Sequence, residues 1–325
     1  MITGYRLVDG HLQTIDAADE VIATADWIDL LAPSRDEAAN IAKTLQIDLP
    51  TRDDMEEIEF SSRLYMEGQA AFMTATVLAQ TEEDDNRVAK PISFILTAEK
   101  LITIRYSSPR PFANFVGHCE KDATGLRDSA TLLTGLLDAI VDRLADILEM
   151  VGREVEDIGA DVFTEKKQTN RRRAERYQQA LISIGQKAAI SSNVRESLTS
   201  LQRLFTFLAT VRLQGIDHNG LKSRAKTLTR DASSLSEHVA FLSSKITFLL
   251  DATLGLISLE QNNTMKVFSV VAVMFLPPTL IASTYGMNFN NMPELSNPWG
   301  YPIVLGVMAL VTVVPFVLFK RKGWL

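Results

Sequence analysis

Residues 267–287 read VFSVVAVMFLPPTLIASTYGM, and no charged side chain occurs from there to Pro293. About 20 apolar residues in a helix span the roughly 30 Å of a bilayer's hydrocarbon core, so this stretch predicts a transmembrane helix. A second uncharged stretch runs from Leu295 to Phe319, and its helix is expected to begin near Pro302. Together the stretches predict a membrane hairpin, with two buried helices of a soluble protein as the alternative.

Basic residues flank the predicted hairpin. Lys266 precedes the first stretch, the connection carries only Glu294, and a basic cluster follows the second stretch at Lys320, Arg321 and Lys322. By the positive-inside rule both termini are expected in the cytoplasm. We expect a first span at about 266–286, an outer loop at 287–300 and a second span at about 301–319.

Composition excludes several other classes of function. The chain has 325 residues, 46% of them hydrophobic, and a net charge of −7, which does not favour nucleic-acid binding. Cys119 is the single cysteine, and the histidines lack metal-ligand spacing. No phosphate-binding loop of the nucleotide-binding type occurs, and the N-terminus lacks the basic and apolar segments of a signal peptide. We therefore expect no enzyme, no organic cofactor, no nucleotide and an N-terminal part that stays in the cytoplasm.

A heptad pattern precedes the first span. Its apolar and small residues recur at steps of three and four, at Leu221, Ala225, Leu228, Ala232, Leu235, Val239, Leu242, Ile246, Leu249, Thr253 and Leu256. Such a pattern predicts a long helix packed in coiled-coil fashion, beginning after the turn at 215–220 and continuing to Tyr285. At 1.5 Å per residue that helix is on the order of 100 Å long. An antiparallel partner is predicted at about 170–213, preceded by another long helix at about 128–163.

The N-terminal part reads as a small α/β unit. Ser34 is placed to cap a helix that runs to about Leu45. Strands are predicted, from β-branched and aromatic residues between turn signals, at 27–31, 70–80, 92–98 and 101–106.

The end of the first span carries a specific motif. Tyr285-Gly286-Met287-Asn288-Phe289 is followed by a loop whose residues are Met292, Pro293, Glu294 and Leu295. This combination resembles the signature and outer loop of the CorA family of magnesium channels, and the resemblance extends over essentially the whole chain. It implies passive influx of Mg²⁺, with Co²⁺ and Ni²⁺ as further cargo, across the inner cell membrane.

The resemblance also implies an α+β integral membrane protein that assembles as a homopentamer. In that architecture a cytoplasmic α/β domain at 1–127 is followed by a funnel of long antiparallel helices and a stalk helix at 128–265. The membrane domain is expected at 266–325. First spans of this family line one central pore, and Gly286, Met287 and Asn288 are expected to form its selectivity filter.

Helical spacing places a stripe of small and polar residues on one face of the first span. The stripe consists of Ser269, Ala272, Leu276, Thr279 and Ser283, and it extends toward the cytoplasm through Met265, Asn262 and Asp251. Polar groups inside a membrane favour a protein interior or a watery path, although small residues also simply allow close helix packing. We expect this face to line the pore, with a ring of Asp251 attracting cations. Met265, Phe268 and Leu276 are expected to form an apolar gate.

Members of this family close when cytoplasmic Mg²⁺ binds acidic residues between subunits. The resemblance places the family's Mg²⁺-sensing aspartate near Thr227, which has no carboxylate. We therefore take Asp231 as the sensing residue instead. An acidic run supplies the other candidates, Glu83, Asp84 and Asp85, with a solvated loop as the alternative. The doubled Pro277-Pro278 departs from the family's single proline and is expected to kink or loosen the first span.

Two alternatives remain at this point. A zinc transporter of the related branch would share the fold but differ at the Gly-Met-Asn tripeptide and its loop. A membrane-anchored cytoplasmic sensor or scaffold would carry no ion flux, and it leaves Asn288 unexplained.

Overall fold

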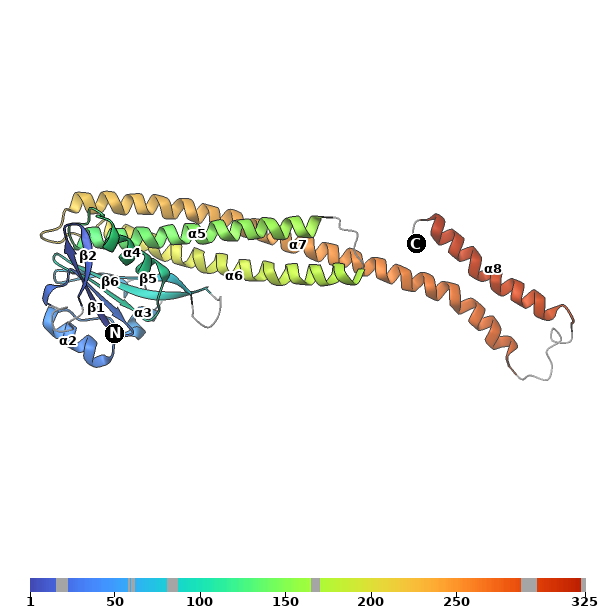
Figure 1. Cartoon of the computed structure of the whole chain (residues 1–325). Coiled ribbons are helices and arrows are strands. Elements are labelled where there is room, and N and C mark those ends of the chain that lie inside the picture. The colour runs from blue at the N-terminus through green and yellow to red at the C-terminus, as the bar shows by residue number, and fades with distance from the viewer. Residues whose placement is uncertain are drawn as a thin grey trace. The chain divides into compact units, whose positions relative to one another are not determined.

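The computed structural model describes residues 1–15, 23–57, 59, 62–80, 87–164, 170–287 and 297–322, and Figure 1 shows its ribbon. The chain divides into two compact units. The first comprises Met1–Phe163 and Ile182–Leu249, and the second comprises Thr164–Leu181 and Leu250–Leu325.

The described strands of the first unit form one seven-stranded sheet in the order β2-β1-β3-β7-β6-β5-β4. The pairing of β3 with β7 is parallel, and the other pairings are antiparallel. Their bounds are β1 Ile2–Val8, β2 His11–Ile15, β3 Trp27–Leu31, β4 Leu64–Glu67, β5 Ala70–Gln80, β6 Arg87–Thr97 and β7 Leu101–Arg105.

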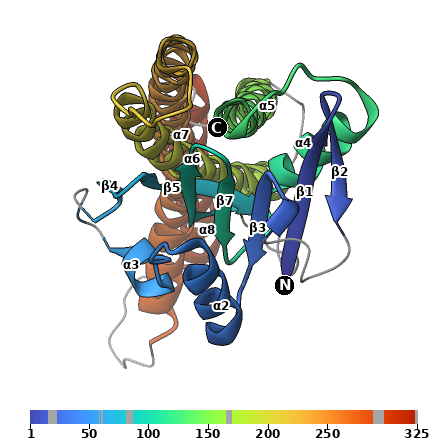
Figure 2. The ribbon, with the colours of Figure 1, turned by 90° about the vertical axis from the view of Figure 1, so that its left-hand side faces the viewer.

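Helices cover both faces of this sheet (Figure 2). On one face α2 (Arg35–Leu45) and α3 (Arg52–Glu56) bury Ile41 and Met55 against strand residues such as Ile28. On the other face α4 (Arg110–Lys121) and α5 (Ser129–Phe163) pack in a second hydrophobic core, which contains Trp27, the residue before Ile28. Successive strand residues point to opposite faces, which is why Trp27 and Ile28 belong to different cores.

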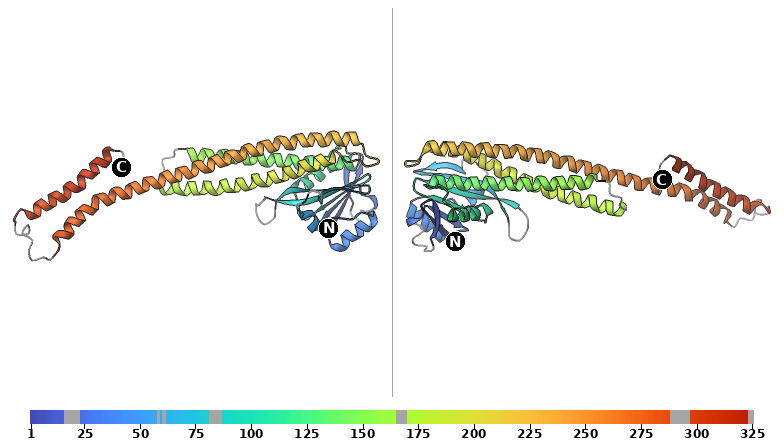
Figure 3. Two further views of the ribbon diagram at one scale, coloured as in Figure 1. Left: turned by 180° about the vertical axis from the view of Figure 1, so that it is seen from behind. Right: turned by 45° about the horizontal axis from the view of Figure 1, so that its top comes forward.

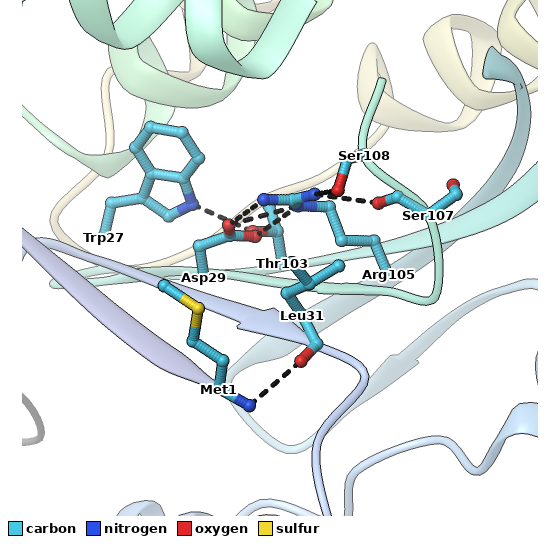
Figure 4. A network of polar contacts seen from close by, with 8 residues as sticks. All are labelled: Met1, Trp27, Asp29, Leu31, Thr103, Arg105, Ser107 and Ser108. Atoms are coloured by element: carbon cyan, nitrogen blue, oxygen red, sulfur yellow. Dashed lines mark hydrogen bonds and ion pairs between the residues drawn. The ribbon is translucent and has the colours of Figure 1, made fainter. Parts of the chain in front are cut away.

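A buried ion pair joins the central parallel strands, as Figure 4 shows. Arg105 of β7 donates to Asp29 of β3 through Nη2 at 2.7 Å and through Nε at 3.1 Å to each carboxylate oxygen. Thr103 donates its hydroxyl to the same carboxylate at 2.6 Å, and the Trp27 indole donates to Thr103 at 3.0 Å. Because the exposed fraction is 4% for the Asp29 side chain and 11% for the Arg105 side chain, loss of either leaves an uncompensated buried charge.

Long helices complete the first unit. Helix α6 spans Asn170–Leu208 and α7 spans His218–Tyr285, and both continue into the second unit. The predicted heptad residues of α7 are buried from Leu221 to Thr253, except Leu235, which is half-buried. Each buried Leu, Ile or Val stabilises the fold by about 1.5–3 kcal/mol, so this apolar seam is a main source of stability.

Contacts fix the direction of the helices that flank α7. On α5, a Cβ at Gly152 would lie 3.8 Å from Leu242, and one at Gly159 would lie 3.4 Å from Leu249, so α5 runs parallel to α7. On α6, Arg195 donates to Ser243 at 2.6 Å and Gln202 donates to Ser236 at 3.0 Å. Helix α6 therefore runs antiparallel to α7, which confirms the predicted antiparallel partner.

The second unit contains the end of α7 and helix α8 (Gly300–Arg321), which runs back in the opposite direction (Figure 3). The apolar stretches of both helices are almost entirely unburied in the single chain. Both helices are long and apolar enough to cross a membrane. Because their apolar side chains lie bare in the single chain, they need lipid or other subunits to cover them.

Pro277 and Pro278 lie inside α7, which runs through them as one helix to Tyr285. Each proline lacks an N–H, so the carbonyls of Val273 and Met274 lose their usual intrahelical donors. The doubled proline therefore opens the hydrogen-bond ladder locally without ending the span.

Local elements agree with the sequence-based expectation at one place and differ at two. The α2 helix has the predicted Ser34 cap and a full capping box with Glu37. The segment around Asp53 forms α3, for which no helix was predicted, because Thr51 and Asp54 make a second capping box and Met55 is buried, while Asp53, Asp54 and Glu56 stay exposed. The expected helix at 170–213 ends at Leu208.

Replacing Arg105 by Ala should strongly destabilise the chain, because it leaves the Asp29 carboxylate buried and unpaired. Breaking a buried pair costs about 3–5 kcal/mol, which corresponds to a fall of roughly 10 °C in the midpoint of thermal unfolding. Circular dichroism of the full chain in detergent measures this midpoint. Arg153→Ala, which breaks an exposed pair with Glu149, is the control and should change it little. Equal shifts for the two variants would contradict a structural role for the buried pair.

Candidate functional site

The polar residues of the predicted stripe lie exposed on α7. Ser269, Ala272, Thr279 and Ser283 are all exposed. Ser269 donates its hydroxyl to the Met265 carbonyl at 2.8 Å, and Thr279 donates to the Phe275 carbonyl at 2.7 Å. A hydroxyl whose proton is used in this way presents lone pairs outward as acceptors. The waters around a metal cation direct their hydrogens outward, so this stripe has the polarity that a hydrated cation requires.

Apolar side chains accompany these acceptors. The exposed fractions of Met265, Phe268 and Leu276 are 63%, 66% and 67%. Val271 and Phe275, which helical spacing places off the stripe, are exposed as well, at 45% and 63%. Exposure in the single chain therefore does not distinguish a pore-facing side from a lipid-facing one, and only the polar residues set the stripe apart from the rest of the helix.

Acidic and amide side chains continue the stripe before the span. Asn262 and Asp251 are both exposed on α7, at helical steps that keep them on the face of Met265. The basic cluster of Lys320, Arg321 and Lys322 is exposed at the end of α8, where the Lys322 amide donates to the Leu318 carbonyl at 3.0 Å.

The predicted filter begins where α7 ends. The Gly286 amide donates to the Ala282 carbonyl at 2.9 Å, and a Cβ at Gly286 would lie 3.1 Å from that oxygen. Met287 follows with an exposed fraction of 49%. A helix C-terminus carries a negative partial charge, which favours a cation beside it. Asn288 and the loop residues Met292, Pro293, Glu294 and Leu295 lie outside the described residues.

Asp231 has carboxylate neighbours that sequence reasoning missed. It lies exposed on α7 and raises the pKa of both Asp138 and Asp142 on α5. Burial is the larger cause of both shifts; Asp142 and Asp231 add to it for Asp138, and Asp146 and Asp231 add to it for Asp142. The four-residue spacing of the α5 carboxylates was visible in the sequence, but their proximity to Asp231 depends on the parallel packing of α5 and α7.

The other regulatory candidates are not placed with Asp231. Glu83, Asp84 and Asp85 lie outside the described residues. Within the part of the chain that the structure describes, no group of three or more His, Cys, Asp or Glu side chains is arranged to hold a metal ion.

Two bare apolar helices, one of which continues from an α/β unit as a single long helix, define an integral membrane protein with a large part outside the bilayer. Residues 23–321 match the family model described as CorA-like Mg²⁺ transporter protein. The chain belongs to the CorA family, as the sequence motif predicted.

Similar proteins agree over the full length. The chain is 34% identical over 326 residues to the magnesium transport protein CorA of Pasteurella multocida, with 100% of both chains covered. It is 32% identical over 327 residues to that of Escherichia coli K12, again with 100% of both covered. The structure of the CorA magnesium transporter from Methanocaldococcus jannaschii superposes with a TM-score of 0.75 at 18% identity, covering 100% of this chain and 99% of that one. The last comparison supports the fold.

Replacing Asp142 by Asn should stabilise the chain near neutral pH, by about 1–3 °C in the unfolding midpoint. The raised pKa means that the ionised carboxylate costs stability in the folded state. This cost is absent below the ordinary Asp pKa of about 4 and complete above the raised pKa, so the gain should vanish in acid.

Unfolding midpoints of the full chain at pH 7 and near pH 4 test this effect. Asp157→Asn, which removes an exposed carboxylate further along α5, is the matched control. A gain for Asp142→Asn of equal size at both pH values would contradict the electrostatic explanation.

Proposed function

We propose that this protein mediates passive influx of Mg²⁺ across the inner cell membrane, with Co²⁺ and Ni²⁺ as further cargo. The observation that carries the proposal is an uncharged span of α7 that presents hydrogen-bond acceptors and ends in Gly286-Met287-Asn288. Family membership and the names of the magnesium-transporting relatives support the choice of ion.

The ion passes the outer end of α7 in its hydrated form. Mg²⁺ holds its water shell tightly and usually keeps several waters when it binds. The Asn288 amide oxygens and the Gly286 carbonyls, one set from each subunit of a homopentamer, accept hydrogen bonds from those waters. The negative partial charge at the end of α7 supports cation binding there.

Further rings follow along the span. Thr279 and Asn262 offer polar groups to the hydrated ion, and a ring of Asp251 attracts cations at the inner end. Between them Met265, Phe268 and Leu276 form an apolar constriction that closes the path by dewetting. The exposure of these side chains in the single chain is consistent with a path assembled from several subunits.

The membrane potential supplies the driving force. With both termini in the cytoplasm, an inside-negative potential of about 100 mV favours entry of a divalent ion by about 4.6 kcal/mol. The basic cluster Lys320, Arg321 and Lys322 supports this orientation.

Cytoplasmic Mg²⁺ regulates the same path by binding acidic residues at subunit boundaries. Asp231 is one ligand, and Glu83, Asp84 and Asp85 supply the others. The mutual repulsion of Asp231 with Asp138 and Asp142 supports this role, because a bound cation relieves it.

Replacing Asn288 by Ala should reduce Mg²⁺ uptake by at least about tenfold and weaken competition by Co²⁺, because hydrogen bonds to the hydrated ion are lost in each subunit. Uptake into liposomes is measured with a Mg²⁺-sensitive dye. Asn290→Ala removes an identical side chain two residues away, and its uptake should stay close to that of the unsubstituted protein. Unaltered uptake and competition in Asn288→Ala would rule out this filter.

Replacing Leu276 by Asn should keep the path wet and increase Mg²⁺ flux when internal Mg²⁺ is high, by at least about tenfold, since an apolar constriction gates by dewetting. The matched control is Val271→Asn, which places the same side chain off the stripe. Flux is normalised to the amount of reconstituted protein. A similar increase in both variants would contradict the proposed pore face.

A further inference from the structure

An ion pair joins α6 to α7 close to the start of the span. The Arg173 guanidinium of α6 donates to the Glu260 carboxylate of α7 at 3.2 Å. Both residues belong to the second unit, and Figures 1 and 3 show the start of α6 alongside α7 there. Only 15% of the Glu260 side chain and 35% of the Arg173 side chain are exposed, so the pair is largely sheltered from water.

The burial of α7 changes at Glu260. This residue is partly buried, whereas every residue from Gln261 to Ser269 is exposed in the single chain. The uncharged stretch begins at Val267, seven residues after Glu260, which is about 10 Å along a helix. The ion pair with Arg173 therefore lies at the boundary between the packed part of α7 and the part that leads into the span.

The ion pair also lies on the face of α7 opposite the stripe. At 3.6 residues per turn, Asn262, Met265 and Ser269 lie roughly 160°, 140° and 180° around the helix from Glu260. Helix α6 thus contacts α7 on the side away from these residues. The contact leaves the stripe face free for an ion path.

A second ion pair between helices provides a comparison. Lys245 of α7 contacts Glu156 of α5 at 3.0 Å, and 69% of the Glu156 side chain is exposed. Loss of Lys245 would leave a carboxylate that water can hydrate, so this pair contributes little. Loss of Arg173 would leave the sheltered Glu260 carboxylate without its partner, which is a larger cost. The Arg173 pair is therefore the one that resists separation of its helices.

We propose that Arg173 and Glu260 are positioning residues for the ion path, because their ion pair holds α7 immediately before the span and sets the position of Asn262 and Met265. This inference rests on the proposed transport function. Neither positioning residue touches the ion. While the pair is formed, the Met265 side chains of neighbouring subunits meet and the apolar constriction closes. When it is broken, this part of α7 moves more freely and the constriction leaks.

Mg²⁺ flux into liposomes tests the role in the ion path. In Arg173→Ala and in Glu260→Gln, flux at high internal Mg²⁺ should rise at least about fivefold, while flux at low internal Mg²⁺ should change less than about twofold. The difference arises because an open path does not depend on the constriction. Arg173→Lys keeps the charge and should keep the path closed. The charge exchange Arg173→Glu/Glu260→Arg should restore most of the closure.

Hydrogen exchange of the full chain in nanodiscs measures the hold on α7 independently of transport. Amides of residues 257–266 should exchange at least about fivefold faster in Arg173→Ala than in the unsubstituted protein, because local opening is easier. The matched control is Lys245→Ala, which breaks the exposed pair with Glu156. This control should alter neither the exchange of these amides nor the flux.

The two measurements separate the possible failures. Equal exchange of residues 257–266 in Arg173→Ala and the unsubstituted protein would overturn the hold on α7. Faster exchange with unaltered closure, an equal leak in Lys245→Ala, or a leak that neither Arg173→Lys nor the charge exchange repairs would overturn the positioning role. If the unsubstituted protein carries no Mg²⁺ while Arg173→Ala still speeds exchange, the transport function fails and the role in the ion path fails with it, but the hold on α7 is confirmed.

Discussion

Helix α7 buries one apolar seam from Leu221 to Leu249 and, further along, exposes most of its apolar side chains, although Val270 is buried. The seam commits its first part to pack with α5 and α6, since an unpacked heptad stripe would leave many large side chains in water. The second part cannot remain in water for the same reason. One helix, α7, therefore connects the rest of the structure: its first part packs on protein, and its second part needs lipid or other subunits around it.

The chemistry of the span depends on its lack of charged residues as much as on the residues that it contains. No charged residue occurs from Val267 to Pro293, so a cation within it would meet only acceptors and apolar groups. Hydroxyls that donate to the preceding turn keep their lone pairs available as acceptors. Such a surface suits an ion that retains its shell, and it would serve poorly for one that must be stripped of water.

Helical periodicity and a helix-cap pattern predicted the long helices well, and features that depend on how elements pack together escaped the sequence reading. The Ser34 cap was confirmed because it depends on neighbours within one helix, and the heptad residues of α7 were confirmed because their spacing marks one buried face whichever helices cover it. Strands β1, β2 and β4 were not predicted. They lie toward the two edges of the sheet and bury few of their side chains, so burial leaves little pattern in their sequences. The proximity of Asp231 to Asp138 escaped prediction because it depends on how α5 packs beside α7. The motif at Gly286 was read from the sequence, and the position of Asn288 stays a prediction.

The passive transport of Mg²⁺ by this chain is tested by divalent-cation flux into liposomes that contain the purified full chain. Under an inside-negative potential we expect Mg²⁺ entry that follows the potential without proton movement. The hexammine complex of cobalt, which mimics a hydrated ion, should block this entry. Zinc-only flux coupled to protons would place the protein in the zinc-transporting branch. The absence of any flux, with the protein inserted and folded, would contradict a transport function and favour a membrane-anchored sensor.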